Sequence, residues 1–194
     1  GNFRPEYRAD WMQRSDYQQL PLTPLGSAAL RALLEQLLGS DPSVTELPAA
    51  IEARTAGNPF FTEEVISALI EAEQLVGAPG AYRLVGSVER VKIPPTVQAV
   101  LAARIDRLAE REKRVLQTAG IIGKDFARPL LAQIIEAHGR APLATAELDG
   151  ALRLLCDLDF LFERALYPVA EYAFKHPLTH EVAYGSQLQE RRRA

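Results

Sequence analysis

The sequence has 194 residues, of which 47% are hydrophobic, and a formal net charge of -3 at pH 7. This length allows one large domain or two small ones, and the charge provides no general attraction to nucleic acid. Its single cysteine, Cys156, excludes an intrachain disulfide and a cysteine-based zinc cluster, which fits a cytoplasmic protein, and no apolar run approaches the ~20 residues of a membrane span.

The two ends of the sequence indicate a segment of a longer protein. Residues 1–24 are polar and interrupted by prolines, with too little apolar surface to fold alone. We expect them to be the tail of a preceding domain. Residues 189–194 continue a helical pattern without a stop signal, so we expect the parent chain to continue beyond them.

Residues 25–93 predict a helical subdomain that ends in a short hairpin-like segment. Its apolar periodicity indicates helices over Pro24–Leu38, about Pro48–Thr55, and from Pro59 to about Gln74. Tyr82–Val85 is strand-like, and residues 87–93 either pair with it or stay irregular.

The start of the third helix carries unusually clear signals. Gly57 tolerates the turn that ends the preceding helix, and Asn58 is a favoured N-cap residue. Pro59 follows at the first helical position, where its missing N–H group is tolerated. A capped amphipathic helix with no further role explains these residues by itself.

Residues 94–194 predict a winged helix. Thr96 caps a helix that runs to Leu108, and further helices are expected after it, with two strands before the last one. These elements are Glu110–Gly120, Phe126–His138, Thr145–Leu158, the strands Phe160–Arg164 and Val169–Phe174, and Pro177–Arg193. Helix, turn, helix, helix and hairpin is the winged-helix order, so the predicted fold class is mainly α with a small β-hairpin.

No catalytic motif is found, so we do not expect this chain to be an enzyme. Gly123-Lys124 is followed by Asp125, and Thr118 stands where a phosphate-binding loop needs glycine. The neighbouring Glu63 and Glu64 are interpreted as solvent-exposed helix residues.

His176 and His180 share one face of a predicted helix. This spacing suits a metal ion, but no third ligand accompanies the pair, so no metal site is predicted. A histidine at the junction of a strand and a helix can also act simply as a cap.

Three segments resemble parts of STAND ATPases, an AAA-related family that includes apoptotic ATPases, plant resistance proteins, large bacterial transcription regulators and ATPase regions fused to class III cyclases. Gly57-Asn58-Pro59-Phe60-Phe61 resembles the Gly-x-Pro element of the helical lid. Phe174–Tyr184 resembles the winged-helix motif Phe-Arg-His-Ala-Leu-x-x-Glu-x-Ala-Tyr. Phe3–Tyr7 with Leu20–Leu25 resembles the last strand of the ATPase core and its exit.

This resemblance implies the lid and winged helix of a bacterial nucleotide-dependent signalling switch, with Gly57, Pro59 and His176 contacting nucleotide in the intact parent. Pro59 would pack against adenine and His176 would lie near the phosphates. Pro177 replaces the usual alanine, and no aspartate follows the histidine, which weakens the transfer of the phosphate-sensing role.

The same resemblance implies partners and a cofactor that lie outside this chain. ATP or ADP with Mg would bind to a preceding nucleotide-binding core, with no nucleotide held tightly by this chain alone. A helical or repeat domain would follow, self-association is possible, and the parent would control an output such as an adenylate or guanylate cyclase.

The alternative function is a DNA-binding winged helix of a transcription regulator. The expected recognition helix, Thr145–Leu158, carries Glu147, Asp149 and Asp157 against Arg153 alone. DNA binding requires cations that neutralise phosphates, so we expect that this helix does not bind DNA.

Overall fold

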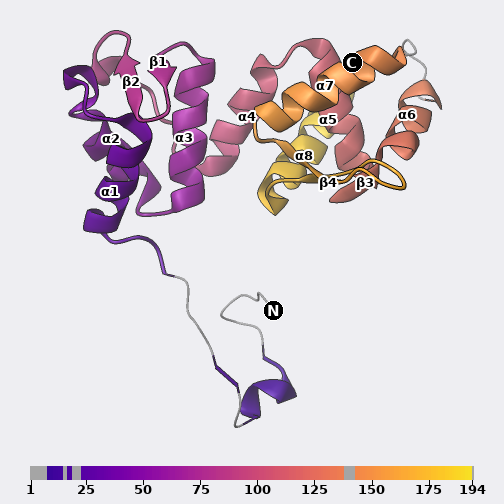
Figure 1. The fold of residues 1–194 in the computed structure, drawn as a ribbon, viewed down its shortest axis with the longest axis horizontal. Coiled ribbons are helices and arrows are strands. Elements are labelled where there is room, and N and C mark those ends of the chain that lie inside the picture. The colour runs from indigo at the N-terminus through magenta and orange to yellow at the C-terminus, as the bar shows by residue number, and fades with distance from the viewer. Residues whose placement is uncertain (1–7, 15–16, 19–22, 138–142, 194) are drawn as a thin grey trace.

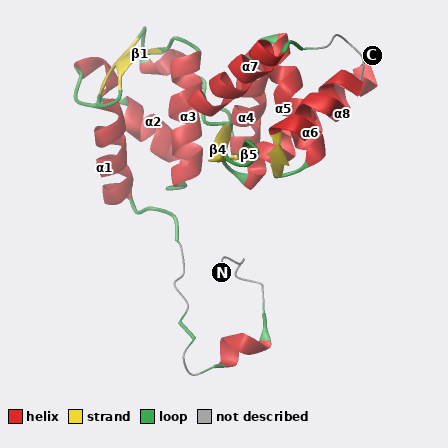
Figure 2. Ribbon diagram, turned by 45° about the vertical axis from the view of Figure 1, so that its right-hand side comes forward, coloured by secondary structure: helices red, strands yellow, loops and turns green. Residues whose placement is uncertain are grey.

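A computed structural model describes residues 8–14, 17–18, 23–137 and 143–193 of the chain, and the side chains of Trp11 and of residues 188–193 are not part of that description. The described residues are mainly α-helical, with two small antiparallel sheets. Figure 1 shows the helices in two groups on either side of α4 (Val97–Arg107), and Figure 2 shows the same arrangement from another side.

The first helical unit, residues 27–84, packs three helices against a short hairpin. Its elements are α1 (Ser27–Leu38), the 3-10 turn η2 (Pro42–Val44), α2 (Leu47–Thr55), α3 (Pro59–Glu71), β1 (Leu75–Ala78) and β2 (Ala81–Leu84). Leucines one turn apart on α1 enter the core, as the amphipathic pattern requires. The fully or nearly buried core residues include Leu30, Leu34, Leu38, Leu47, Ile51, Val65, Leu69 and Leu75.

The winged-helix unit, residues 110–193, follows α4. It contains α5 (Glu110–Ile122), β3 (Asp125–Ala127), α6 (Arg128–Ala137), α7 (Thr145–Asp157), β4 (Leu161–Ala165), β5 (Glu171–Phe174) and α8 (Pro177–Arg193). The sheet order is β3-β5-β4, with every pair antiparallel. The order α5, α6, α7 and the β4–β5 hairpin matches the winged-helix order that the sequence predicts, and β3 between α5 and α6 is an addition to it.

The sheet contributes aromatic residues to the hydrophobic core of the winged-helix unit. Phe126 is opposite Tyr172 in the register of β3 and β5, and Leu161 is opposite Phe174 in that of β4 and β5. Phe126 stacks on Tyr172 with 6.0 Å between ring centroids. Together with Leu116, Leu152 and other apolar side chains of α5 and α7, these rings form the second hydrophobic cluster.

Helix α4 belongs to both clusters. Thr96 caps it by accepting a hydrogen bond from the N–H group of Ala99 at 3.2 Å, as predicted. Val100 is buried in the first cluster and Ile105 in the second. The expected boundary at residues 93–94 therefore marks the start of a helix that both units share.

Some expected boundaries are wrong or lie outside the described residues. Phe126, expected to begin a helix, lies in strand β3, because its ring pairs with Tyr172 across the sheet; α6 begins only at Arg128. For residues 87–93 the irregular alternative is the one observed: they hold a short 3-10 turn, Val88–Arg90, and no strand. The segment at residues 3–7 and the first half of the one at 20–25, expected to belong to an ATPase core, lie outside the described residues.

Candidate functional site

The junction of α2 and α3 is held in one backbone shape. Gly57 is buried with φ +79°, and its carbonyl oxygen accepts a hydrogen bond from the N–H group of Leu25 at 2.8 Å. A Cβ atom at position 57 would lie 2.2 Å from the carbonyl oxygen of Leu25. The position therefore needs glycine both for its φ angle and for space.

Asn58 and Pro59 then start α3 as the sequence predicts. The side-chain oxygen of Asn58 accepts a hydrogen bond from the N–H group of Phe61 at 3.1 Å. Pro59 is the first residue of the helix and is exposed. The Thr62 hydroxyl, fully buried, donates to the carbonyl oxygen of Asn58 at 2.9 Å and fixes the turn from inside.

His176 lies between β5 and α8 and caps the helix. Its Nδ1 atom accepts a hydrogen bond from the N–H group of Leu178 at 3.1 Å, so the neutral ring carries its proton on Nε2. Burial lowers the pKa of His176, and the nearby charge of Glu181 opposes that shift. The imidazole therefore caps the start of α8 through Nδ1.

An aromatic stack brings the segments Gly57–Phe61 and Phe174–Tyr184 together. The ring of Phe60, next to Pro59, lies on the imidazole of His176 with 3.8 Å between centroids and 16° between planes. Gly57 and Pro59 flank the start of α3, and His176 stands at the start of α8. Of the three predicted site residues, Pro59 and His176 are thus linked through Phe60, and Gly57 fixes the turn before Pro59.

The second histidine has a packing role. The Nε2 atom of His180 lies 3.0 Å from the carbonyl oxygen of Gly120, to which it donates. The ring also packs edge-on against Phe174, with 5.1 Å between centroids. Within the described residues, no three His, Cys, Asp or Glu side chains form a group that could hold a metal ion.

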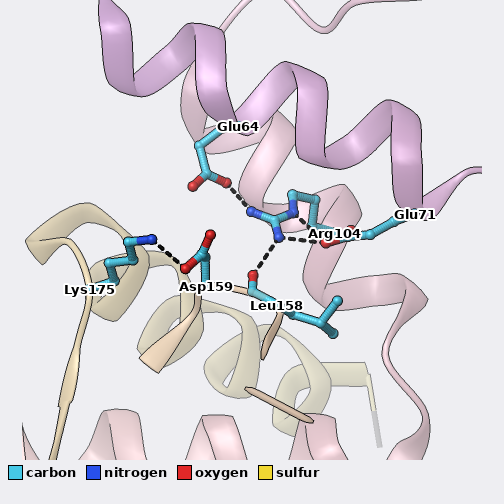
Figure 3. Close-up of polar contacts among 6 residues, drawn as sticks. All are labelled: Glu64, Glu71, Arg104, Leu158, Asp159 and Lys175. Carbon is cyan, nitrogen blue, oxygen red and sulfur yellow. Dashed lines mark hydrogen bonds and ion pairs between the residues drawn. The ribbon is translucent and has the colours of Figure 1, made fainter. Parts of the chain in front are cut away.

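A buried ion cluster lies between the two units, and the sequence did not indicate it. Arg104 of α4 is 1% exposed and bonds to Glu64 and Glu71, both on α3 (Figure 3). Its Nη2 atom also donates to the carbonyl oxygen of Leu158 at 2.7 Å, and its guanidinium lies 4.6 Å from the ring centre of Phe160.

Glu64 corrects an expectation, because it is buried and not part of a solvated face. Its neighbour Glu63 is exposed, as expected. Burial raises the pKa of Glu64 even though the charge of Arg104 acts in the opposite direction. Burial also acts to lower the pKa of Arg104, but hydrogen bonds and charges from Glu71 and Glu64 outweigh it and raise that pKa. The guanidinium therefore remains charged.

The positions of these charged residues on apolar helix faces could have indicated the cluster. Glu64 and Glu71 lie seven positions apart on α3, on the side that carries Val65 and Ala68. Arg104 occupies a core-facing position of α4 between Val100 and Leu108. Charged residues in apolar stripes predict paired burial.

The exposed side of α7 is acidic. Glu147 and Asp157 are exposed, and the carboxylate of Asp149 accepts a hydrogen bond from Nε of Arg128 at 2.6 Å. Arg153 is exposed on the same helix. Phosphates of a duplex would meet more negative than positive charge along this helix.

Comparison with known proteins gives a family match over part of the chain and a similarity to a much longer protein. Residues 26–77 match a family described as a domain of unknown function (DUF8739). Over 194 residues, covering 97% of the chain, the sequence is 25% identical to an uncharacterized protein, R02095, of Rhizobium meliloti (strain 1021). The chain spans 18% of the length of that relative. Neither name states an activity. Among the described helices, none is both long enough and apolar enough to cross a membrane.

Proposed function

We propose that this chain is the lid and winged-helix part of a nucleotide-dependent signalling switch of the STAND type. The stack of Phe60 on His176 supports this most directly. It joins the Gly-Asn-Pro segment and the histidine segment, which are far apart in the sequence and are the two described segments that resemble the family.

In the parent protein, a preceding core would bind ATP or ADP with Mg. Exposed Pro59 would face the adenine side of the nucleotide, and the Nε2–H group of His176 would face the phosphate side. Gly57 would fix the turn that presents Pro59. Nucleotide bound in this way favours the conformation that makes these contacts, and its exchange shifts the population. A linked output such as a cyclase would respond to that shift, in the cytoplasm.

DNA reading has less support. The exposed acidic residues of α7, Glu147 and Asp157, oppose a phosphate backbone. The cation at Arg128 is engaged with Asp149.

The test is the ADP affinity of the longer protein that contains this segment. Pro59→Ala should weaken ADP binding, whereas Pro129→Ala, which changes another exposed proline in a first helical turn, should leave it unchanged. His176→Asn separates two roles, because an asparagine oxygen can still cap α8 but offers no ring for phosphate contact or stacking. Wild-type ADP affinity in both Pro59→Ala and His176→Asn would remove the proposal.

A further inference from the structure

Arg104 lies where the two hydrophobic clusters meet. One turn before it, Val100 is buried in the first cluster, and Ile105, next to it, is buried in the second. The sequence of α4 contains neither glycine nor proline, so the helix has no residue that favours a bend. A displacement of one unit relative to the other therefore has to pull α4 out of one core.

The guanidinium of Arg104 bonds to both sides of this junction at once. On the side of the first helical unit, Nε donates to a carboxylate oxygen of Glu71 at 2.8 Å, and Nη1 bonds to Glu64. On the side of the winged helix, Nη2 donates to the carbonyl oxygen of Leu158. Figure 3 shows the guanidinium between α3 and the turn after α7. The planar fork of arginine can hold such divergent acceptors together, whereas a lysine amine cannot match its geometry.

Two further contacts surround this bond network. The ring of Phe160, fully buried, covers one side of the guanidinium. The adjacent Asp159 pairs with Lys175 (Figure 3). The Phe60–His176 stack then joins the start of α3 to the start of α8, which is a second connection between the same two units.

We propose that Arg104 locks the first helical unit and the winged helix into one rigid body. Any motion that displaces one unit relative to a neighbouring domain then carries the other unit with it. This inference concerns the described residues themselves and does not depend on nucleotide binding, so it stands or fails separately from the proposed function.

The test is a distance distribution measured by pulsed EPR in the 194-residue chain. Spin labels at Ala28→Cys on α1 and Gln133→Cys on α6 use exposed positions, in a Cys156→Ala background. The wild-type cluster should give one narrow distance. Arg104→Met should add a second, broader population, and the control Arg107→Met, an exposed cation on the same helix, should keep the narrow distance.

Far-UV circular dichroism identifies variants that remain folded. If Arg104→Met does not fold, Glu71→Gln takes its place, because it weakens the same fork at a half-buried position. A broad distribution in the otherwise wild-type chain would overturn the proposal. A narrow, unshifted distribution in the folded Arg104→Met variant, or in Glu71→Gln where that variant replaces it, would also overturn it.

Discussion

Arg104→Met is the sharpest perturbation of this molecule. The side chain of Arg104 is 1% exposed and that of Glu64 is 8% exposed, so the substitution leaves a buried carboxylate without its cation. Breaking a buried pair from one side costs about 3–5 kcal/mol of unfolding free energy. Methionine fills much of the space of the arginine stem, so the cavity contribution is small. We expect a loss of about 3–5 kcal/mol of unfolding free energy near neutral pH.

Urea unfolding followed by circular dichroism measures this loss, with Arg107→Met as the matched control. The control should stay within about 0.5 kcal/mol of the wild type, as exposed substitutions usually do. At acidic pH the loss in Arg104→Met should shrink, because a protonated Glu64 needs no partner charge. A loss below about 1 kcal/mol at neutral pH would refute the reasoning, since the cluster would then contribute no more than an exposed ion pair.

Four further outcomes follow from the same structure. Burial raises the pKa of Glu64 above the ordinary value of 4.5, so the folded chain binds the Glu64 proton more tightly than the unfolded chain. The free energy of unfolding, measured with urea, should therefore fall as pH rises from 4.5 through the folded pKa, and Glu64→Gln should flatten this pH dependence. Gly57→Ala should lose at least about 1–2 kcal/mol from its positive φ, with more from the clash. Gly26→Ala, at the N-cap of α1 with negative φ and no neighbour within 4 Å of a new Cβ, should lose less than about 1 kcal/mol, the preference of an N-cap for glycine over alanine; equal thermal shifts would contradict this. Asn58→Ala should cost about 1 kcal/mol through the lost cap. Duplex DNA should bind weakly at low salt in an anisotropy titration; tight binding that salt and Arg153→Ala both abolish would favour the transcription-regulator alternative.

Local signals predicted the parts of the fold that depend on neighbouring residues. The caps at Asn58 and Thr96 form as expected because each side chain bonds to a backbone N–H group three residues later. The hairpin before α8 was also predictable, since two short segments rich in apolar and aromatic residues flank Tyr167-Pro168. These features need no information about distant parts of the chain.

Long-range pairing determines what the sequence missed. Residues 125–127 form a strand because β5, much later in the chain, offers its edge. Glu64 is buried because Arg104, forty positions away, supplies the charge. Similarly, Pro59 and His176 were predicted as site residues by resemblance. Their connection, through the stack of Phe60 on the imidazole of His176, is visible only in the folded chain.

The central claim is that nucleotide in the longer protein contacts the starts of α3 and α8. Hydrogen exchange with mass spectrometry tests it directly, with and without saturating ADP. The account predicts that ADP slows exchange in peptides covering residues 57–62 and 176–180, and that it leaves the first turn of α6, which starts at Arg128, unchanged as an internal control. ADP binding that protects neither of these two segments would contradict the account.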